Sequence, residues 1–317
     1  MKLLVTRRMT QAAESLISAR FDATFLPDSP GLSPADAARA LMDYDLVMPT
    51  LGDGFDKAAF AQQGIRCKLL ANFGAGFNHI DIEAARAAGV AVTNTPEVVT
   101  NSTADIAMTL LLMTARRAGE GERLVRAGKW EGWQPTQLLG THVSGKTVGI
   151  IGMGRIGKAI ARRCHFGFDM RVVFYNRSAV SALDFPAEQI PDLHDMLSQC
   201  NFAVVAVPGG AGTRHLIGAT ELERLGRAGH IVNIARGDVV DEAALIHALE
   251  RGAIAGAGLD VYEREPVVPD ALKALPNVTL LPHLGTATEE SRTAMASRAL
   301  DNLIAFAEGR NLPDRVA

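Results

Sequence analysis

The chain has 317 residues, of which 48% are hydrophobic, 21% charged and 5% aromatic, and its formal net charge is −3. This length allows two domains of ordinary size, and the composition is that of a globular rather than a disordered protein. The small negative charge and low aromatic content argue against nucleic acid as a partner. No segment approaches the roughly 18 uninterrupted apolar residues of a membrane span, so none is expected.

The amino terminus, MKLLVTRR, does not have the long apolar segment of a secretory signal, because its apolar run ends at Val5 before a charged pair. Cys67, Cys164 and Cys200 are far apart, odd in number and in no CxxC pair. This usage is typical of small buried thiols in a reducing compartment and predicts neither disulfides nor a metal site. We therefore expect a cytoplasmic protein.

The first hundred residues alternate short apolar runs with helical segments. The runs expected as strands are KLLVTR, DLVMPT, KLLANFG and VAVTNTP. Two helices are expected in SPADAARALMDY and DIEAARAAGV, and Ser33 is the expected amino-terminal cap of the first, just before Pro34. Strands that alternate with helices predict a parallel sheet.

A long helix is expected after Pro96, where NSTADIAMTLLLMTARRAGEGERLVRAG places apolar residues at helical spacings. Apolar residues occupy all sides of this helix from Leu110 to Met113, which predicts burial against a domain interface or a second subunit. A less regular segment, KWEGWQPTQLLGTHVSG, follows it and contains both tryptophans of the chain.

From Lys146 the alternation of strands and helices resumes. Six strands are expected, in KTVGIIG, MRVVFYN, FAVVAVP, HIVNIAR, IAGAGLDVY and VTLLPH. Most are near-continuous apolar runs, as is typical of parallel strands buried on both faces. A final amphipathic helix is expected in TEESRTAMASRALDNLIAFAEGR.

The segment GMGRIG matches the pattern G-x-G-x-x-G, with glycines at 152, 154 and 157. The pattern alone is weak evidence, but here an expected strand (147–151) precedes it, a helix follows, and a second strand (171–176) closes the unit. In that context Gly152 makes a tight turn, Gly154 lets the backbone approach a pyrophosphate, and Gly157 lets the helix pack closely on the strand. The start of the helix offers free N–H groups to the phosphates, so the sequence predicts a dinucleotide site.

The choice between NAD and NADP is expected to depend on VVFYNRS, which ends in Asn176, Arg177 and Ser178. Asn176 lies roughly 20 residues beyond the third glycine, near the place where an acid usually binds the ribose 2′-hydroxyl. Arg177 can instead pair with a phosphate through its guanidinium, and Ser178 can donate a further hydrogen bond. This predicts a preference for NADP(H). In the alternative, Arg177 stacks on adenine or points to solvent, and NAD(H) is preferred or both cofactors are used.

Three segments place chemically useful residues at the carboxyl ends of later strands, where open α/β sheets bind ligands. VNIARGDVVDEAAL contains Arg236, LDVYEREP contains Glu265, and LLPHLG contains His283. Each alone is ambiguous, but together they supply what reduction of a 2-oxo acid needs. A guanidinium holds the substrate carboxylate and polarises the carbonyl, an imidazolium protonates the developing alkoxide, and a carboxylate orients the imidazole.

These motifs resemble those of the D-2-hydroxyacid dehydrogenase family, and within it most closely those of the glyoxylate/hydroxypyruvate reductases. FGAGFNHIDIEAARAAGVAVTNTP, TADIAMTLLL, GIIGMGRIGKAIARR, NIARGDVVDEAAL, GLDVYEREP and LPHLGTAT occur in family order over essentially the whole chain. The resemblance implies an α/β fold with two parallel sheets. A Rossmann cofactor domain would cover 101–285, and a discontinuous flavodoxin-like substrate domain would consist of 1–100 and 286–317.

The resemblance also implies roles for three sets of residues. In the catalytic set, the substrate arginine, the orienting acid and the general acid/base are Arg236, Glu265 and His283. The substrate set, in which two backbone N–H groups hold the carboxylate, is Leu51, Ala75, Gly76 and Arg236. The cofactor set, beyond the three glycines and residues 176–178, is Thr103, Arg155, Ile156, Val207, Pro208, Thr213, Ile234, Ala235, Asp260 and Gly285. Within it, Asp260 would bind the nicotinamide amide.

The resemblance further implies a homodimer built on the long helix after Pro96. In that dimer Trp133 either reaches the partner's active site or is an ordinary residue of the dimer core. Small residues in FGAGFN and PTLGDG suggest a compact pocket, which favours NADPH-dependent reduction of glyoxylate or hydroxypyruvate. Two alternatives stay open: a reductase of bulkier 2-oxo acids such as phenylpyruvate, and a dinucleotide-sensing binding protein.

Overall fold

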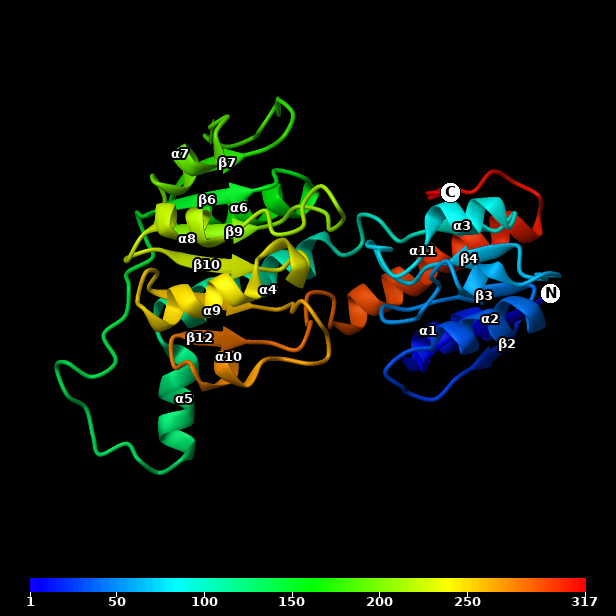
Figure 1. Ribbon diagram of the computed structural model, residues 1–317, viewed down its shortest axis with the longest axis horizontal. Helices are drawn as coiled ribbons and strands as arrows, with labels where there is room; N and C mark the ends of the chain where they lie inside the picture. The colour runs from blue at the N-terminus through cyan, green and yellow to red at the C-terminus, as the bar shows by residue number, and fades with distance from the viewer. The chain divides into compact units, whose positions relative to one another are not determined.

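A computed structural model describes all residues from 1 to 317 (Figure 1). The chain divides into two compact units. We call Thr100–Gly285 the central unit, and Met1–Val99 together with Thr286–Ala317 the terminal unit. Every strand pairing in both units is parallel, so the chain has the α/β fold class expected from the alternation of strands and helices.

The terminal unit has a five-stranded sheet in the order β2-β1-β3-β4-β5, which is the order of flavodoxin-like sheets. Its strands are β1 (Lys2–Val5), β2 (Asp22–Phe25), β3 (Leu46–Met48), β4 (Leu69–Ala71) and β5 (Ala91–Thr93). Its helices are α1 (Gln11–Ser18), α2 (Pro34–Asp43), the 3₁₀ helix η1 (Ala59–Ala61), α3 (Ile82–Ala87) and α11 (Glu289–Ala307).

The central unit has a seven-stranded sheet in the order β12-β11-β10-β9-β6-β7-β8, and this is the Rossmann order with one further strand. Its strands are β6 (Thr147–Ile151), β7 (Arg171–Tyr175), β8 (Glu188–Gln189), β9 (Phe202–Val205), β10 (His230–Asn233), β11 (Gly256–Leu259) and β12 (Val278–Leu280). Its helices are α4 (Thr100–Ala115), α5 (Ala118–Arg126), α6 (Arg155–Phe168), α7 (Leu193–Leu197), α8 (Ala219–Leu225), η2 (Gly237–Val239), α9 (Glu242–Glu250) and α10 (Asp270–Ala274).

The central sheet is buried on both faces, and alternate residues of its strands enter two different cores. Val148 and Ile150 of β6 pack with residues of α4 and α6. Ile151 lies on the other face of the sheet. There it packs, together with residues of the other strands, against α7, α8, α9 and α10. Burial on both faces explains why these strands are nearly continuous apolar runs in the sequence.

The terminal unit joins both ends of the chain. Beyond α11 the chain pairs with the edge of β5, where the Val316 N–H donates to the Val92 carbonyl at 2.8 Å. The buried Asn302 side chain of α11 donates to the Arg298 carbonyl at 2.9 Å and to the Asp314 carboxylate at 2.8 Å. These bonds fix the last residues against the sheet.

Two local expectations are confirmed and several elements were not predicted. Ser33 caps α2 by accepting from the Asp36 N–H, and α11 forms where the last amphipathic pattern predicts it. The sequence patterns after Lys146 predicted an alternation of strands and helices without locating α7, α8 or α10, and the sequence did not predict α1, β2 or β8. Their short segments contain no continuous apolar run, and β2 alternates exposed and half-buried residues as an edge strand does.

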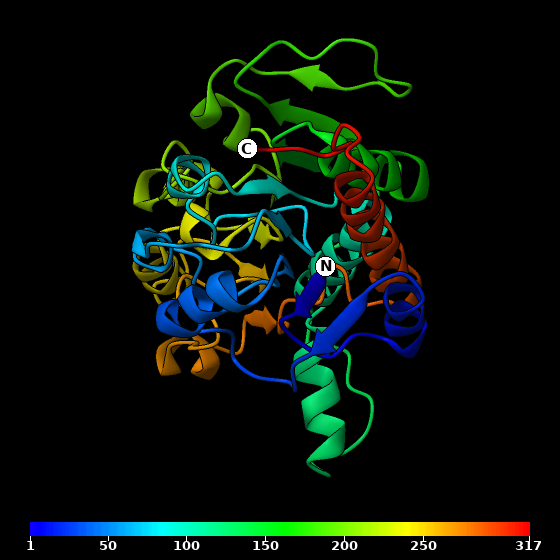
Figure 2. The same cartoon turned by 90° about the vertical axis from the view of Figure 1, so that its right-hand side faces the viewer.

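The expected long helix after Pro96 is divided into α4 and α5. Arg117 takes a left-handed backbone conformation, with φ of 52°, between the two helices. Leu110 and Leu111 of α4 are fully buried, whereas no residue of α5 is. Figures 1 and 2 both show α5 and the loop after it extending away from the central sheet. Among all the helices, none is long and apolar enough to cross a membrane.

Candidate active site

The glycine-rich loop between β6 and α6 has the geometry that a dinucleotide phosphate requires. Gly152 has φ of 100°, and a Cβ atom there would lie 2.8 Å from Val207 Cγ1. A Cβ at Gly157 would overlap the carbonyl oxygen of Gly152, so α6 packs against the loop only because that residue is glycine. At Gly154, by contrast, a Cβ would meet nothing within 4 Å. This open position leaves room for the approach of a pyrophosphate to the helix start, where Arg155 and Ile156 follow.

The loop after β7 lies beside the glycine-rich loop. Asn176 Oδ1 accepts from the Met153 N–H at 3.2 Å, and its Nδ2 donates to the Ser178 carbonyl at 2.9 Å. Arg177 and Ser178 are exposed. The Arg177 guanidinium has no ion pair within the protein. The Asn176 side chain therefore joins the glycine-rich loop to the loop after β7. Arg177 lies in the second of these loops, and its charge is not neutralised by an ion pair.

Asp260, at the end of β11, is a buried carboxylate that ties two segments together. It accepts from the Leu284 N–H at 2.6 Å and from the Gly285 N–H at 2.8 Å. The Thr103 hydroxyl of α4 donates to the Gly285 carbonyl at 3.1 Å. Burial raises the pKa of Asp260, although the two backbone N–H groups oppose that shift.

His283 and Glu265 form a direct pair. His283 Nδ1 lies 2.8 Å from Glu265 Oε2, and Glu265 Oε1 accepts from the Tyr262 N–H at 3.1 Å. Burial alone would raise the pKa of Glu265, but the hydrogen bond and charge of His283, together with the Tyr262 N–H, outweigh it and the pKa is lowered. Because Nδ1 is occupied by Glu265, the imidazole has Nε2 left for another partner.

Arg236 follows β10 and joins the same group. Its guanidinium donates to the Ala235 carbonyl at 2.6 Å, while its Nε is buried without a partner. Burial lowers the pKa of Arg236, and the nearby negative charge of Glu265 opposes that shift. A Cβ atom at Gly237 would overlap the Tyr262 backbone, so this glycine allows the Arg236 loop to pack directly on the segment that leads to Glu265.

The other predicted cofactor residues of the central unit are at the same edge of the sheet. Ile234 and Ala235 are buried directly after β10. Val207 and Pro208 follow β9, and the Thr213 hydroxyl donates to the Pro208 carbonyl at 2.7 Å. Because all these strands are parallel, their carboxyl ends, and the loops that follow them, gather along one edge.

In the terminal unit, the predicted substrate residues occupy two adjacent loops. Leu51 follows β3 and is 42% exposed, whereas Ala75 and Gly76 follow β4. The two loops are joined where the Phe73 N–H donates to the Pro49 carbonyl at 2.9 Å.

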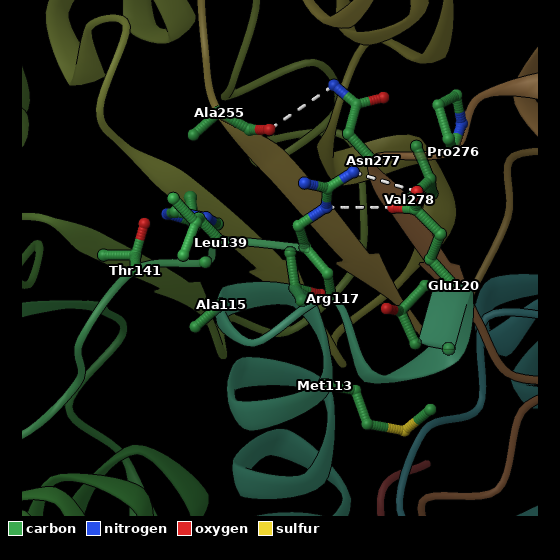
Figure 3. Close-up of a pocket in the computed structure, with 15 residues that line it drawn as sticks. Met113, Ala115, Arg117, Glu120, Leu139, Thr141, Ala255, Pro276, Asn277 and Val278 are labelled. Atoms are coloured by element: carbon green, nitrogen blue, oxygen red, sulfur yellow. Dashed lines mark hydrogen bonds and ion pairs between the residues drawn. The ribbon is translucent and has the colours of Figure 1, made fainter. Parts of the chain in front are cut away.

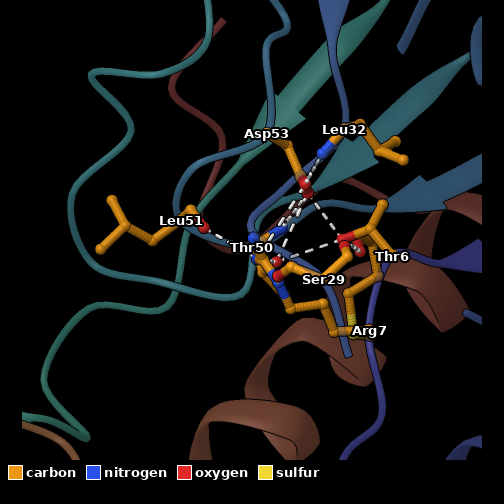
Figure 4. Close-up of polar contacts among 8 residues, drawn as sticks. Thr6, Arg7, Ser29, Leu32, Thr50, Leu51 and Asp53 are labelled. Carbon is orange, nitrogen blue, oxygen red and sulfur yellow. Dashed lines mark hydrogen bonds and ion pairs between the residues drawn. The ribbon is translucent and has the colours of Figure 1, made fainter. Parts of the chain in front are cut away.

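A buried polar cluster that the sequence analysis missed holds the Leu51 loop (Figure 4). The fully buried Asp53 carboxylate accepts from the Thr6 hydroxyl at 2.6 Å and from the Thr50 N–H at 2.8 Å. Arg7 contacts the Thr50 hydroxyl and donates to the Leu51 carbonyl at 2.8 Å. No sequence motif predicts this cluster, because Thr6 and Arg7 are more than forty residues from Thr50 and Asp53 in the sequence.

Trp133 is not part of any of these groups within its own chain. It lies in the loop after α5, is 80% exposed, and belongs to the segment that projects on the side of the strands' amino ends (Figure 1).

Comparison with known proteins places the chain in a family. Residues 108–285 match the model of the D-isomer-specific 2-hydroxyacid dehydrogenase NAD-binding domain. A glyoxylate reductase of Thermococcus gammatolerans is 41% identical over 99% of this chain and 95% of its own length. A glycerate dehydrogenase of Hyphomicrobium methylovorum is 35% identical over 98% of this chain and 97% of its own.

A solved structure agrees with these relatives. The crystal structure of an NADPH-dependent glyoxylate/hydroxypyruvate reductase from Sinorhizobium meliloti, in complex with NADP and malonate, superposes with a TM-score of 0.87. It is 36% identical and covers 100% of this chain and 96% of its own. The chain belongs to the D-isomer-specific 2-hydroxyacid dehydrogenase family, and it is an oxidoreductase that acts on a CH–OH group with a nicotinamide dinucleotide.

The geometry of the glycine-rich loop leads to a prediction. We expect Gly154→Ala to retain the melting temperature of the unmodified protein, because its Cβ atom meets nothing. Its affinity for the dinucleotide should fall about tenfold or more, since the methyl group occupies the approach of the pyrophosphate and one charge-assisted hydrogen bond is worth roughly 1.5–3 kcal/mol. Calorimetric titration with NADPH and thermal melting measure both.

The matched control is Gly167→Ala, on the exposed face of the same helix, where a Cβ also meets nothing. It should leave both quantities unchanged or raise the stability by up to about 1 kcal/mol. Equal dinucleotide affinity in the two variants would contradict the assignment of the loop.

Proposed function

We propose that the protein reduces small 2-oxo acids, glyoxylate and hydroxypyruvate, with NADPH as its preferred cofactor. The observation that carries this proposal is the grouping of Arg236 with the His283–Glu265 pair at the carboxyl edge of the dinucleotide-binding sheet. A fixed cation and an oriented imidazole are the two groups that reduction of a 2-oxo acid needs from the protein.

In the proposed reaction, each of the three side chains has a distinct role. The bound nicotinamide supplies the hydride that reaches the carbonyl carbon. Arg236 binds the substrate carboxylate and polarises the carbonyl through its planar set of donors. His283 donates a proton from Nε2 to the oxygen that becomes the hydroxyl, and accepts one there in the reverse direction. Glu265 holds the Nδ1 side of the imidazole and so fixes the orientation of the ring.

Loss of the imidazole tests this mechanism. His283→Ala should lower the turnover number for glyoxylate by about 10²- to 10⁴-fold, which is the usual contribution of a general acid. The control is His194→Ala, because His194 Nε2 makes a similar pair with Glu221 at 2.6 Å outside this group. Steady-state kinetics should show a normal turnover number for the control. A normal turnover number for His283→Ala would remove the histidine from the mechanism.

The preference for NADPH is supported by the loop after β7. The position that usually carries an acid is Asn176, whose side chain is engaged with Met153 and Ser178. No carboxylate there repels a 2′-phosphate, and the exposed Arg177 has no competing ion pair in the protein. The Sinorhizobium meliloti relative, which was solved with NADP, is consistent with this preference.

The role of Arg177 can be tested against a neighbouring arginine. Arg177→Ala should raise the Michaelis constant for NADPH about tenfold or more and leave that for NADH nearly unchanged, because only NADPH has the phosphate. Arg162→Ala is the control, since Arg162 already pairs with Asp184 and is also exposed. Equal effects of Arg177→Ala on the two cofactors would contradict the phosphate contact.

We propose small substrates because the two loops assigned to the substrate carry mostly small side chains. Ala75 and Gly76 have the smallest side chains available, and PTLGDG offers only Leu51 as a bulky group. The relatives named above act on glyoxylate, hydroxypyruvate or glycerate, to judge from their names. The same loops are proposed to bind the carboxylate through the Ala75 and Gly76 N–H groups.

We also propose a homodimer that covers the segment after α4. Val125, Trp130, Trp133 and Leu139 are all more than half exposed, so α5 and its loop carry an apolar surface with no partner in one chain. A cavity of about 330 Å³ lies beside it, between the end of α4 and the amino ends of β10–β12, and Arg117 and Leu139 are among its lining residues (Figure 3). A second copy of the chain would bury these groups.

Sedimentation velocity tests the dimer. The unmodified protein should sediment with twice the mass of the chain, and Leu139→Asp should shift it toward the mass of one chain, because a charge would be buried in the interface. Phe166→Asp is the control, since Phe166 is similarly exposed on α6. A monomeric unmodified protein at micromolar concentration would contradict the proposal.

The cysteines support a cytoplasmic location. Cys67, Cys164 and Cys200 are all free and buried, and burial raises the pKa of each to about 12. They are therefore packing residues rather than reactive thiols, and a protein without disulfides is suited to a reducing compartment.

A further inference from the structure

The loop after β4 is held by side-chain amides in an unusual way. Three successive backbone carbonyls, those of Gly74, Ala75 and Gly76, each accept a hydrogen bond from an asparagine. Asn72 Nδ2 donates to the Gly74 carbonyl at 2.9 Å and to the Gly76 carbonyl at 3.0 Å. Asn94 Nδ2 donates to the Ala75 carbonyl at 2.7 Å. Two amides thus fix the direction of three consecutive peptide groups.

The two asparagines are themselves fixed by neighbouring strands. Asn72 directly follows β4, is fully buried, and its N–H donates to the Thr93 carbonyl at 3.0 Å. Asn94 directly follows β5, whose last residue is in register with Ala71 of β4. Both amides therefore belong to the rigid end of the sheet rather than to the loop that they hold.

The direction of the carbonyls determines the direction of the N–H groups. In a trans peptide the C=O of one residue and the N–H of the next point in opposite directions within one plane. Because the Gly74 and Ala75 carbonyls point toward the asparagines, the Ala75 and Gly76 N–H groups must point away from them. Neither N–H donates a hydrogen bond within the protein. Both N–H groups are therefore available as hydrogen-bond donors to an anion.

We infer that Asn72 and Asn94 are positioning residues that orient the Ala75–Gly76 loop so that its two N–H groups can bind the substrate carboxylate. This inference rests on the proposed function, in which the substrate is a 2-oxo acid, and adds the residues that set its affinity for the carboxylate. The asparagines act on the substrate only through the loop, so they change binding and not the chemical step.

Another buried asparagine in the terminal unit provides a control that distinguishes positioning of the loop from a general contribution to stability. Asn302 of α11 is also fully buried, and its Nδ2 donates to the Arg298 carbonyl and the Asp314 carboxylate. Its loss removes a similar number of hydrogen bonds, none of which is made to the loop after β4. Asn302→Ala is therefore the matched control for stability.

The experiment compares Asn94→Ala, Asn72→Ala and Asn302→Ala with the unmodified protein. The half-buried Asn94 is the milder site, so its variant stays informative if Asn72→Ala does not fold. Calorimetric titration of the NADPH-bound protein with malonate, a simple dicarboxylate, measures anion affinity without turnover. Steady-state kinetics with glyoxylate give the Michaelis constant and the turnover number separately.

Each asparagine variant of the loop should bind malonate about tenfold or more weakly and show a Michaelis constant for glyoxylate raised by a similar factor. The turnover number and the affinity for NADPH should change by no more than about twofold. A tenfold loss corresponds to about 1.4 kcal/mol, which is the size of one hydrogen bond. Asn302→Ala should melt at a lower temperature and keep the malonate affinity and Michaelis constant of the unmodified protein.

Unchanged malonate affinity in Asn94→Ala and Asn72→Ala, or an equal loss in Asn302→Ala, would overturn the inference. An unmodified protein that binds malonate but reduces no 2-oxo acid would contradict the proposed function while the malonate series still decides the role of the asparagines. An unmodified protein that does not bind malonate would overturn the carboxylate site itself.

Discussion

The parallel direction of the central strands is the constraint on which the rest of the structure depends. Since all seven strands run the same way, every loop that follows a strand emerges at one edge. The glycine-rich loop follows β6, Arg236 follows β10, Asp260 follows β11 and His283 follows β12. The direction of the strands thus brings residues that are far apart in the sequence to the same edge of the sheet.

Backbone groups then set the final geometry. The Asp260 carboxylate accepts from N–H groups of the segment that follows β12, and the Glu265 carboxylate accepts from the nearby Tyr262 N–H, which together anchor the residues around His283. Gly157 and Gly237 contribute by having no side chain, because each lets two backbone segments come closer than a Cβ atom would allow. In the terminal unit, the amides of Asn72 and Asn94 orient the loop after β4 through its backbone carbonyls. Side-chain hydrogen bonds thereby fix loops in both units.

The sequence predicted the parts of the molecule that depend on local pattern. Six of the seven strands of the central sheet were recognisable because burial on both faces demands continuous apolar runs. The glycine-rich loop was recognisable because each glycine has a steric reason. The edge strand β2 could not be predicted, since exposed residues interrupt it, nor could the break at Arg117, where no glycine or proline marks the end of α4. The Asp53 cluster and Asn72 were also missed, because their partners are distant in sequence or are backbone atoms. Contacts of this kind become visible only when the chain is folded.

Reduction of small 2-oxo acids with NADPH can be tested by one assay of the unmodified protein. The oxidation of NADPH and of NADH is followed by absorbance with glyoxylate, hydroxypyruvate, pyruvate and phenylpyruvate in parallel. The account predicts the fastest oxidation with NADPH and the two first acids. Activity mainly with phenylpyruvate would contradict the compact pocket, a preference for NADH would contradict the role of Arg177, and tight binding of the cofactor without turnover of any acid would contradict the proposed reaction itself.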